Sequence, residues 1–197
     1  QGKNPTPLII RDHLQRADFT LEFAGDAPTE RRANLKIQDG CNFMCSFCVI
    51  PFARGRSRSR EMGNLLDEAR ALIARGAKEL VLTGVNLGCY TCEGLTIVDV
   101  VNNLNGLPGL ARIRISSIEP TTVPGELLDC MAEPAHALAP YLHLPLQSGS
   151  DAVLRRMKRR YTRREFVEFV ETACRRVPDL CVGTDILVGI PGESDAE

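Results

Sequence analysis

Leu80-Val81-Leu82-Thr83 is a continuous apolar run of strand length, which is typical of a parallel sheet covered on both faces. Working outward, four further runs of strand character fall at residues 35–38, 112–116, 141–144 and 180–188. Amphipathic or capped segments between them predict helices at residues 64–75, from 96 onward, at 126–131 and from 162 to just before Pro178. Strand and helix alternate five times, so we expect an α/β fold, a (β/α) barrel or part of one, with its active site at the C-terminal strand ends.

The composition is that of an ordinary globular domain, with 197 residues, 44% apolar, 25% charged and a net charge of −1. This charge excludes a chain that binds nucleic acid over its whole surface, so any basic patch must be local. No apolar run is long enough for a transmembrane helix and Gln1 opens no signal peptide, so we expect a cytoplasmic protein without a membrane partner. Residues 1–30 are interpreted as a linker or peripheral segment, and residues 31–197 as the core domain.

Three cysteines follow the first predicted strand at the spacing C-x3-C-x2-C, namely Cys41, Cys45 and Cys48. Thiolates at this spacing can bind three irons of a [4Fe–4S] cubane and leave the fourth iron open, and an open iron can chelate the amino and carboxylate groups of a methionine moiety. A ferredoxin would need a fourth nearby cysteine, and a zinc site would need His136 or His143 from across the fold. We therefore interpret the loop as an open-iron cluster site on the catalytic face.

The cysteine loop, with Phe47 before its last cysteine, resembles the signature of radical S-adenosylmethionine enzymes. Further segments, in an ordered series, resemble the methylthiotransferase branch of that family. They lie at residues 35–42 (LKIQDGCN), 50–55 (IPFARG), 57–60 (SRSR), 82–88 (LTGVNLG), 114–120 (RISSIEP), 144–150 (LPLQSGS) and 185–193 (DILVGIPGE). The resemblance implies a partial (β/α) TIM-like barrel of the radical S-adenosylmethionine type, with five strands visible and a sixth missing.

The enzymes of this branch add a methylthio group to an unreactive C–H bond by means of a 5′-deoxyadenosyl radical. Three segments, KIQDGCN, LTGVNLG and RISSIEP, most resemble the enzymes that act on C2 of threonylcarbamoyladenosine beside the tRNA anticodon. Isopentenyladenosine in tRNA and an aspartate of a ribosomal protein are alternative substrates. A metal-stabilised RNA-binding module without catalysis is an alternative of a different class.

The resemblance also implies which residues meet the cofactor. The aromatic at Phe47 lies, in the family, near the adenine of S-adenosylmethionine. Other contacts are expected from residues that follow the predicted strands, although tight turns between strand and helix explain the glycines equally well. These candidates are Gly84, Asn86, Ser117, Glu119, Gln147, Ser148 and Gly189.

Two basic runs are candidates for contact with RNA phosphates. One follows the cysteine loop, and the other holds seven basic residues between Arg155 and Arg164. A charge run is usually only a solvated helix face, but this density exceeds what solvation needs in a chain of net charge −1. One arginine near the site can instead pair with the carboxylate of S-adenosylmethionine. The RNA-contact candidates are Arg54, Arg56, Arg58, Arg155, Arg159 and Arg160.

Five of the eight cysteines lie outside the cluster loop. Cys89 and Cys92 form a C-x-x-C pair, which is either a redox pair or a ligand for a second cluster, or else two incidental loop thiols. Cys130, Cys174 and Cys181 fall in helix or strand patterns, so we expect them to pack in the core as small apolar side chains.

Full members of the family carry a preceding domain with a second [4Fe–4S] cluster, which is the expected site of sulfur donation, and a small C-terminal RNA-binding domain. Neither is visible in this sequence, so we expect a piece of a longer protein. We expect the chain alone to cleave S-adenosylmethionine without completing methylthiolation. Its expected partners are a tRNA substrate and an electron donor, and we expect a monomer.

Overall fold

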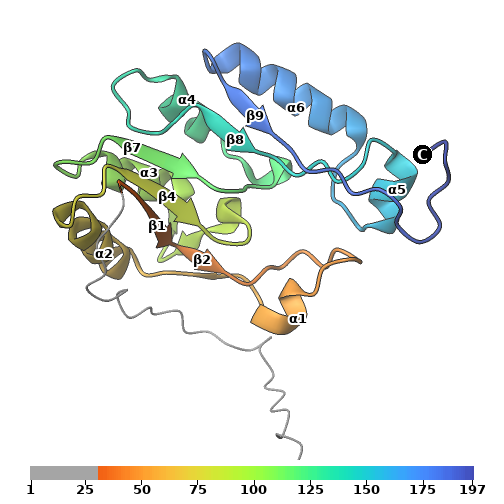
Figure 1. The fold of residues 1–197 in the computed structure, drawn as a ribbon, viewed down its shortest axis with the longest axis horizontal. Coiled ribbons are helices and arrows are strands. Elements are labelled where there is room, and N and C mark those ends of the chain that lie inside the picture. Colours follow the sequence, from red (N-terminus) through yellow and green to blue (C-terminus); the bar gives the residue numbers. More distant parts are fainter. Residues whose placement is uncertain (1–30) are drawn as a thin grey trace, which may run out of the picture.

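A computed structural model describes residues 31–197, in which parallel strands are layered against helices (Figure 1). This arrangement confirms the expected α/β class. The predicted linker at residues 1–30 lies outside the described residues, so the domain boundary at residue 31 stays a prediction.

The strands form two parallel groups. Three of them pair in the order β1-β4-β7, with β1 at Arg32–Lys36, β4 at Glu79–Thr83 and β7 at Arg112–Ile115. The other two, β8 at Tyr141–His143 and β9 at Cys181–Gly183, pair with each other in parallel. A parallel bridge between Ile113 and Leu138 joins the two groups. All five strands therefore run in one direction and end on the same side of the molecule (Figure 1).

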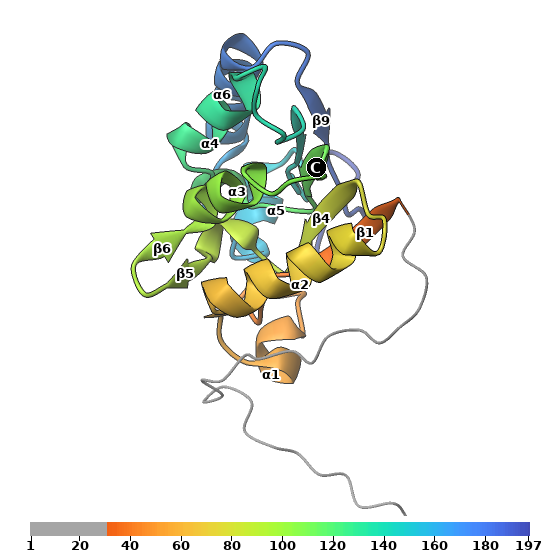
Figure 2. The ribbon, with the colours of Figure 1, turned by 90° about the vertical axis from the view of Figure 1, so that its left-hand side faces the viewer.

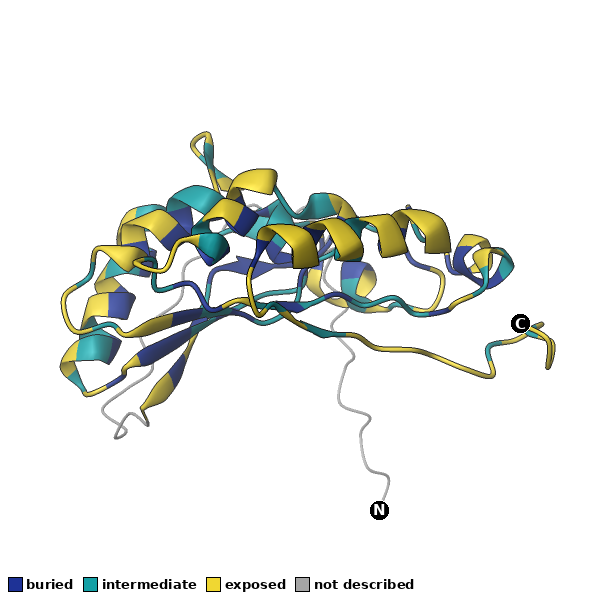
Figure 3. Ribbon diagram, turned by 90° about the horizontal axis from the view of Figure 1, so that it is seen from above, coloured by how far each residue is buried: buried dark blue, intermediate teal, exposed yellow. Residues whose placement is uncertain are grey.

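Helices of the described part lie on one side of these strands (Figure 3). The longer ones are α2 (Met62–Ala74), α3 (Ile97–Asn105), α4 (Gly125–Ala132) and α6 (Arg163–Arg176). As the sequence predicts, α3 and α6 begin with capping boxes, formed by Thr96 with Asp99 and by Thr162 with Glu165. Figure 2 shows α2 lying along the β1 edge of the sheet, while the hairpin of β5 and β6 projects away from it.

The two faces of the sheet differ in character because side chains alternate along a strand. Leu35, Leu82 and Ile115 face the helices and are fully buried in the core. The alternate positions carry polar side chains such as Arg114 and His143, which are only partly buried. Only the cover on both faces suggested by the apolar run at residues 80–83 is not seen within residues 31–197, where the second face carries polar side chains, as the inner face of a partial barrel with helices outside does.

Short elements connect the strands to the helices. They are β2 (Gln38–Asp39), α1 (Ile50–Arg54), β3 (Arg58–Ser59), η2 (Leu87–Cys89), β5 (Thr91–Cys92), β6 (Leu95–Thr96), η3 (Pro120–Thr122) and α5 (Asp151–Arg156). The sequence analysis does not anticipate α1 or α5, because neither is long enough to show a helical period. Local signals do mark their starts, with Pro51 opening α1 and the Ser150 hydroxyl capping α5.

The fifth strand is shorter than the predicted range of residues 180–188. β9 ends at Gly183, and beyond it a bridge between Gln147 and Ile186 continues the pairing. The apolar side chains that indicate a longer strand are exposed, Ile186 by 58% and Val188 by 82%, because no element of the described part packs on them. The first strand is also displaced, since β1 ends at Lys36 and a separate β2 follows.

The core prediction for the three scattered cysteines is wrong for Cys174 and Cys181, which are exposed. Cys174 follows the buried Ala173 on α6 and so points away from the core, and Cys181 opens β9 on its uncovered side. Cys130 is half-buried and packs against the core from α4. None of the helices within residues 31–197 is long and apolar enough to cross a membrane.

Candidate functional site

The three-cysteine loop begins at a glycine that no other residue can replace. Gly40 has a φ of 68°, and a Cβ at this position would lie 2.1 Å from the carbonyl oxygen of Arg56. Next to it, the Cys41 amide donates to the carbonyl of Gly55 at 3.1 Å. The loop is thus pressed against the turn that follows α1, and this contact buries Cys41 and Cys45 while Cys48 is half-buried.

Gln38 lies two residues before Gly40, and its fully buried side chain joins two loops. Its amide nitrogen donates to the carbonyl of Gly40 at 2.7 Å and to the Ser57 hydroxyl at 2.9 Å. Its amide oxygen accepts from the backbone of Val85 at 2.7 Å and of Asn86 at 3.1 Å. Gln38 therefore holds the cysteine loop against the loop after β4, a role that the sequence analysis missed.

The other side of the loop is tied to the end of α5. The Ser46 amide donates to the carbonyl of Met157 at 3.1 Å, and its hydroxyl donates to the carbonyl of Arg156 at 2.8 Å. The guanidinium of Arg160 lies over the ring of Phe43, 4.1 Å from its centre. The dense basic run thus packs directly on the cysteine loop, although the two are more than a hundred residues apart in the chain.

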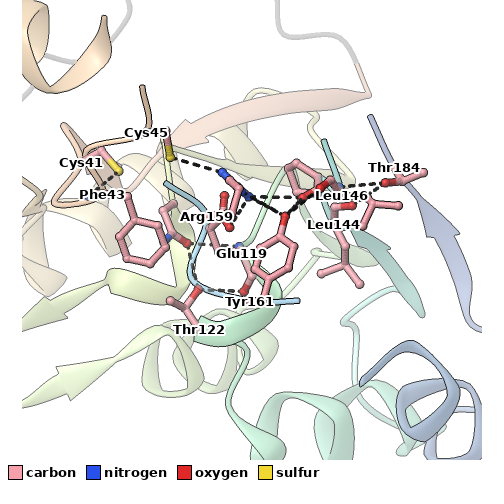
Figure 4. Close-up of polar contacts among 12 residues, drawn as sticks. Cys41, Phe43, Cys45, Glu119, Thr122, Leu144, Leu146, Arg159, Tyr161 and Thr184 are labelled. Carbon is pink, nitrogen blue, oxygen red and sulfur yellow. Dashed lines mark hydrogen bonds and ion pairs between the residues drawn. The ribbon is translucent and has the colours of Figure 1, made fainter. Parts of the chain in front are cut away.

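A buried ion pair connects this basic run to the cysteines (Figure 4). Arg159 donates to the carboxylate of Glu119 at 2.5 Å, to the Tyr161 hydroxyl at 2.9 Å and to the Cys45 sulfur at 3.4 Å. The Tyr161 hydroxyl in turn donates to the carbonyl of Pro145 at 2.5 Å. Burial raises the pKa of the Glu119 carboxyl, which the charge of Arg159 partly opposes, and it raises the pKa of Tyr161 to about 12.

The thiols themselves receive N–H donors, which suits thiolate ligands. The Phe43 amide donates to the Cys41 sulfur at 3.3 Å, and Arg159 reaches Cys45. Burial raises the pKa of the Cys41 thiol, and the charges of Cys45 and Cys48 raise it further, so a bound cation must displace its proton.

The donor set consists of three cysteines, and thiolates are the ligands that hold iron–sulfur clusters. Among residues 31–197, no three His, Cys, Asp or Glu side chains converge as the ligands of one ion do. In a cubane each thiolate binds a separate iron, so the three sulfurs need not converge. His136 contacts Asn102 and His143 contacts Ser117, so neither contact directs a fourth zinc ligand toward the loop.

The predicted cofactor residues after β4 are occupied by protein contacts. A Cβ on Gly84 would lie 2.8 Å from the Gln38 amide oxygen, so the close approach at this glycine is to the protein itself. The Asn86 amide accepts from the Glu119 backbone at 3.3 Å and from the Thr122 hydroxyl at 3.0 Å. Gly84 and Asn86 therefore lock the loops after β4 and β7 together.

The remaining candidates lie on the segments after β7, β8 and β9. Ser117 contacts His143 at 2.8 Å. Gln147 has a φ of 71° and its amide donates to the carbonyl of Asp185, while Ser148 is buried. Gly189, with a φ of 76°, donates its amide to the Glu193 carboxylate at 2.5 Å. Phe47 is 45% exposed on the cysteine loop. All of them come from the catalytic side of the strands.

The RNA-contact prediction needs correction for Arg159, because its side chain is 3% exposed and is committed to Glu119. The Arg58 side chain, 8% exposed and paired with Asp39, is also a poor phosphate contact. In each run, burial therefore distinguishes the arginines that are poor phosphate contacts from those that can reach RNA, a distinction that sequence spacing does not make. The candidates that stay exposed are Arg54, Arg56, Arg155 and Arg160.

Cys89 and Cys92 have different surroundings. Burial raises the pKa of Cys89, with Cys41 and Glu119 adding to the effect, and the Asn86 amide donates to its sulfur at 3.2 Å. Burial also raises the pKa of Cys92, where the added charges come from Glu93 and Glu61. These separate neighbours favour neither a redox pair nor a shared cluster, and the thiols remain best interpreted as incidental.

Known proteins resemble this chain over most of its length. The model of the Radical SAM superfamily matches residues 35–197. The threonylcarbamoyladenosine tRNA methylthiotransferase MtaB of Chlamydia pneumoniae is 41% identical over 84% of this chain and 39% of that protein. A tRNA-2-methylthio-N(6)-dimethylallyladenosine synthase of Cereibacter sphaeroides is 36% identical over 91% of this chain and 42% of that protein. The chain thus spans about two-fifths of the length of these curated relatives.

Among solved structures, the radical S-adenosylmethionine methyltransferase TsrM from Kitasatospora setae, with cobalamin and a [4Fe–4S] cluster bound, matches with a TM-score of 0.65. The two chains are 23% identical, and the match covers 82% of this chain and 32% of that one. At this identity the match shows a shared fold, and it confirms the expectation of a partial barrel.

Proposed function

The chain belongs to the radical SAM superfamily, and on this premise we propose that it is the radical-generating core of a tRNA methylthiotransferase. The observation that carries the proposal is the loop of Cys41, Cys45 and Cys48, which follows β1 and β2 at the C-terminal side of parallel strands, where (β/α) barrels place their active sites. The similarity to two kinds of tRNA methylthiotransferase supports the reaction class.

We assign the three cysteines as ligands to three irons of a [4Fe–4S] cluster. When bound, the cluster supplies the electron that breaks the sulfonium C–S bond of S-adenosylmethionine and yields a 5′-deoxyadenosyl radical. The chain's own part is to fix the loop, through Gly40, Gln38 and Ser46, and to bury two of the thiols. This rigidity supports a site that must hold its cofactor in a single orientation.

Arg159 is proposed to hold the Cys45 sulfur in position. Its guanidinium is always charged, lies 3.4 Å from that sulfur and is held in place by Glu119 and Tyr161. This contact places a fixed positive charge beside one of the three proposed cluster ligands.

The nucleoside part of S-adenosylmethionine is proposed to lie between the cysteine loop and the segments after β8 and β9. Phe47 offers an exposed aromatic face from the loop. Gln147 and Gly189 both have positive φ values, which turn the backbone sharply at the strand ends. Ser148, next to Gln147 in the chain, is buried, and its hydroxyl accepts from the Ser150 amide at 3.1 Å.

The substrate we propose is tRNA, with the methylthio group added to C2 of threonylcarbamoyladenosine. Arg54, Arg56, Arg155 and Arg160 supply an exposed positive surface on both sides of the cysteine loop, which suits RNA phosphates. The higher identity to MtaB than to the dimethylallyladenosine enzyme favours this base. Dimethylallyladenosine is the second candidate, because a 36% identical relative is named for it.

The remaining parts of the reaction are proposed for the full-length protein. We expect a second [4Fe–4S] cluster in a preceding domain as the sulfur donor, together with an external electron donor. A tRNA substrate implies a cytoplasmic location, and we expect a monomer. We predict that residues 1–197 alone produce 5′-deoxyadenosine but no methylthiolated RNA.

The test is a mass spectrum of tRNA nucleosides from a strain that lacks the gene. Loss of 2-methylthio from threonylcarbamoyladenosine alone, and its return when the intact gene is restored, is the expected result. Loss from dimethylallyladenosine instead would select the second candidate. An unchanged tRNA profile would contradict a tRNA substrate, and a ribosomal protein aspartate would then be examined by peptide mass.

A further inference from the structure

A column of polar side chains runs along the lumen face of the strands, where the helices do not reach. At its lower end Arg114 bonds Glu79 at 2.8 Å and lies over the ring of Tyr141, 5.1 Å from its centre. Arg114, Glu79 and Tyr141 therefore interact with one another. At the C-terminal ends of the strands the column finishes in a different set: His143, the last residue of β8, with Ser117 and Asp185 from the segments after β7 and β9.

The upper set is assembled from three neighbouring strands. The Ser117 hydroxyl lies 2.8 Å from Nδ1 of His143, and the Asp185 carboxylate lies 3.4 Å from Nε2 of the same ring. Gly183, the β9 partner of His143, leaves room for this ring, because a Cβ there would lie 3.3 Å from it. Asp185, His143 and Ser117 therefore form a polar network that the pairing of the strands brings together.

The arrangement sets the hydrogen-bonding character of Ser117. Ser117 and Nδ1 of His143 share one hydrogen bond, and the Asp185 carboxylate lies on the Nε2 side of the ring. In the tautomer that carries its proton on Nε2, Nδ1 is an acceptor and the Ser117 hydroxyl donates to it. The Ser117 oxygen is left with lone pairs and no proton to offer, which makes it an acceptor for an N–H or O–H donor.

The position of Ser117 connects it to the reaction site. It stands two residues before Glu119, and residues two apart in extended chain share a face. Glu119 holds Arg159, which touches the Cys45 sulfur. The Ser117 oxygen thus belongs to the partly open lumen beside the cysteine loop, where a base must approach the radical. His143 is 21% exposed there and Asp185 is 64% exposed, so the site is reachable.

We propose that Ser117, oriented by His143 and Asp185, is the acceptor for an N–H donor on the substrate base, the N6–H of an N6-substituted adenine. Ser117 is the contact residue, and His143 and Asp185 are positioning residues. This inference rests on the proposed function, since it names the contact that places such a base at the same site. It replaces the expectation that Ser117 binds S-adenosylmethionine.

The test uses the full-length, cluster-loaded protein and two anticodon stem-loop RNAs. One carries an N6-monosubstituted adenosine, and the other an N6,N6-disubstituted analogue that lacks the N–H. Ser117→Ala is expected to weaken binding of the first RNA by about 2- to 12-fold, which corresponds to one neutral hydrogen bond. It should leave binding of the second RNA and the Kd for S-adenosylmethionine unchanged.

Two companion variants separate a contact from a merely structural role. Ser117→Thr keeps the hydroxyl and is expected to restore binding of the monosubstituted RNA. Asp185→Asn keeps the shape but removes the carboxylate from the Nε2 side of the ring, so it should mimic Ser117→Ala without changing the melting temperature. Asp185 is exposed enough that this variant should fold normally.

The outcomes are distinct. An equal loss for both RNAs, no loss for either, or a loss of affinity for S-adenosylmethionine in place of RNA would each overturn the assignment of Ser117. If the wild-type protein methylthiolates the monosubstituted RNA and the variants do so equally well, the Ser117 subsite is contradicted and the proposed function is not. A wild-type protein that cleaves S-adenosylmethionine but methylthiolates neither RNA contradicts the proposed function, and the subsite with it.

Discussion

Arg159 illustrates, at the scale of a single residue, how burial decides what a charge does. The sequence places it within a dense basic run, where every member is an equal candidate for RNA. In the fold its side chain is 3% exposed and faces Glu119, forty residues away in the chain. Spacing does not encode such a long-range pairing, so the sequence alone could not separate this arginine from the exposed members of the run, and the cluster role of the three cysteines stays a prediction.

The Glu119–Arg159 pair gives a residue-scale prediction. Glu119→Gln removes the negative charge and leaves the Arg159 guanidinium buried without its counter-ion, so we expect a loss of roughly 3 kcal/mol in the free energy of unfolding. Urea unfolding of the full-length protein measures it. The matched control is Asp67→Asn, which breaks the exposed pair with Arg70 and should cost under about 1 kcal/mol. Equal losses in the two variants would contradict the argument.

Two residues, Gln38 and His143, carried sequence signals of their roles that the predictions did not use. Gln38 precedes the glycine and cysteine of the loop, and a polar side chain at the end of a buried strand is a sign of a hydrogen-bonding hub. His143 was considered only as a zinc ligand, yet its contacts run to Ser117 and Asp185. These roles depend on which strand ends meet, and that is known only once the strand order is known.

At the scale of elements, the cysteine loop depends on a single backbone position. Gly40→Ala would place a Cβ 2.1 Å from the Arg56 carbonyl in a residue with positive φ, so the loop must move. We expect the variant to retain little iron after anaerobic reconstitution, measured as iron per chain. Gly76→Ala is the control, because Gly76 also has positive φ but meets no atom within 4 Å, and it should lose about 1 kcal/mol of stability and no iron.

A second element-scale prediction concerns Glu79, which joins β1, β4 and β7 through Arg32, Arg112 and Arg114. Burial works against its charge, but the hydrogen bond and charge of Arg114 and the charges of the other two arginines hold its pKa below the ordinary value of 4.5. A lowered folded-state pKa stabilises the fold above pH 4.5, and this contribution is lost as the pH falls through the folded-state pKa.

Glu79→Gln should therefore lower the free energy of unfolding by about 1–2 kcal/mol at pH 7, a modest value because Arg32 and Arg112 are more than half exposed. The difference from wild type should shrink steadily below pH 4.5. Thermal unfolding at a series of pH values checks the trend. A difference that stays constant down to pH 3 would show that the charge of Glu79 is not the cause.

Helix ends were the best predicted features at this scale, because capping residues act on their immediate neighbours. The capping boxes at Thr96 and Thr162 both form. The predicted strand at residues 180–188 was too long because regular pairing ends at Gly183, leaving one bridge at Ile186, and the side chains of Ile186 and Val188 are exposed within residues 31–197. An apolar residue in a local sequence pattern can be buried in the core or left exposed on the surface of its domain, and the pattern does not distinguish the two.

At the scale of the whole molecule, the parallel strands and the helices on one side of them position the three-cysteine loop. The strands end on one side of the molecule, and the cysteine loop contacts the end of α5 there (Figure 1). The alternation of strands and helices predicted this class of fold from the sequence. The apolar run at residues 80–83 alone indicates cover on both sides, and only the partial-barrel interpretation accounts for helices on one side.

The central claim is that Cys41, Cys45 and Cys48 hold a [4Fe–4S] cluster with an iron open to S-adenosylmethionine. The most direct measurement is the electron paramagnetic resonance spectrum of the full-length protein, reconstituted anaerobically and reduced, with and without S-adenosylmethionine. The signal should require all three cysteines and should change when S-adenosylmethionine is added. A signal that survives a Cys45→Ala substitution, one that S-adenosylmethionine leaves unchanged, or bound zinc without any signal would contradict the claim.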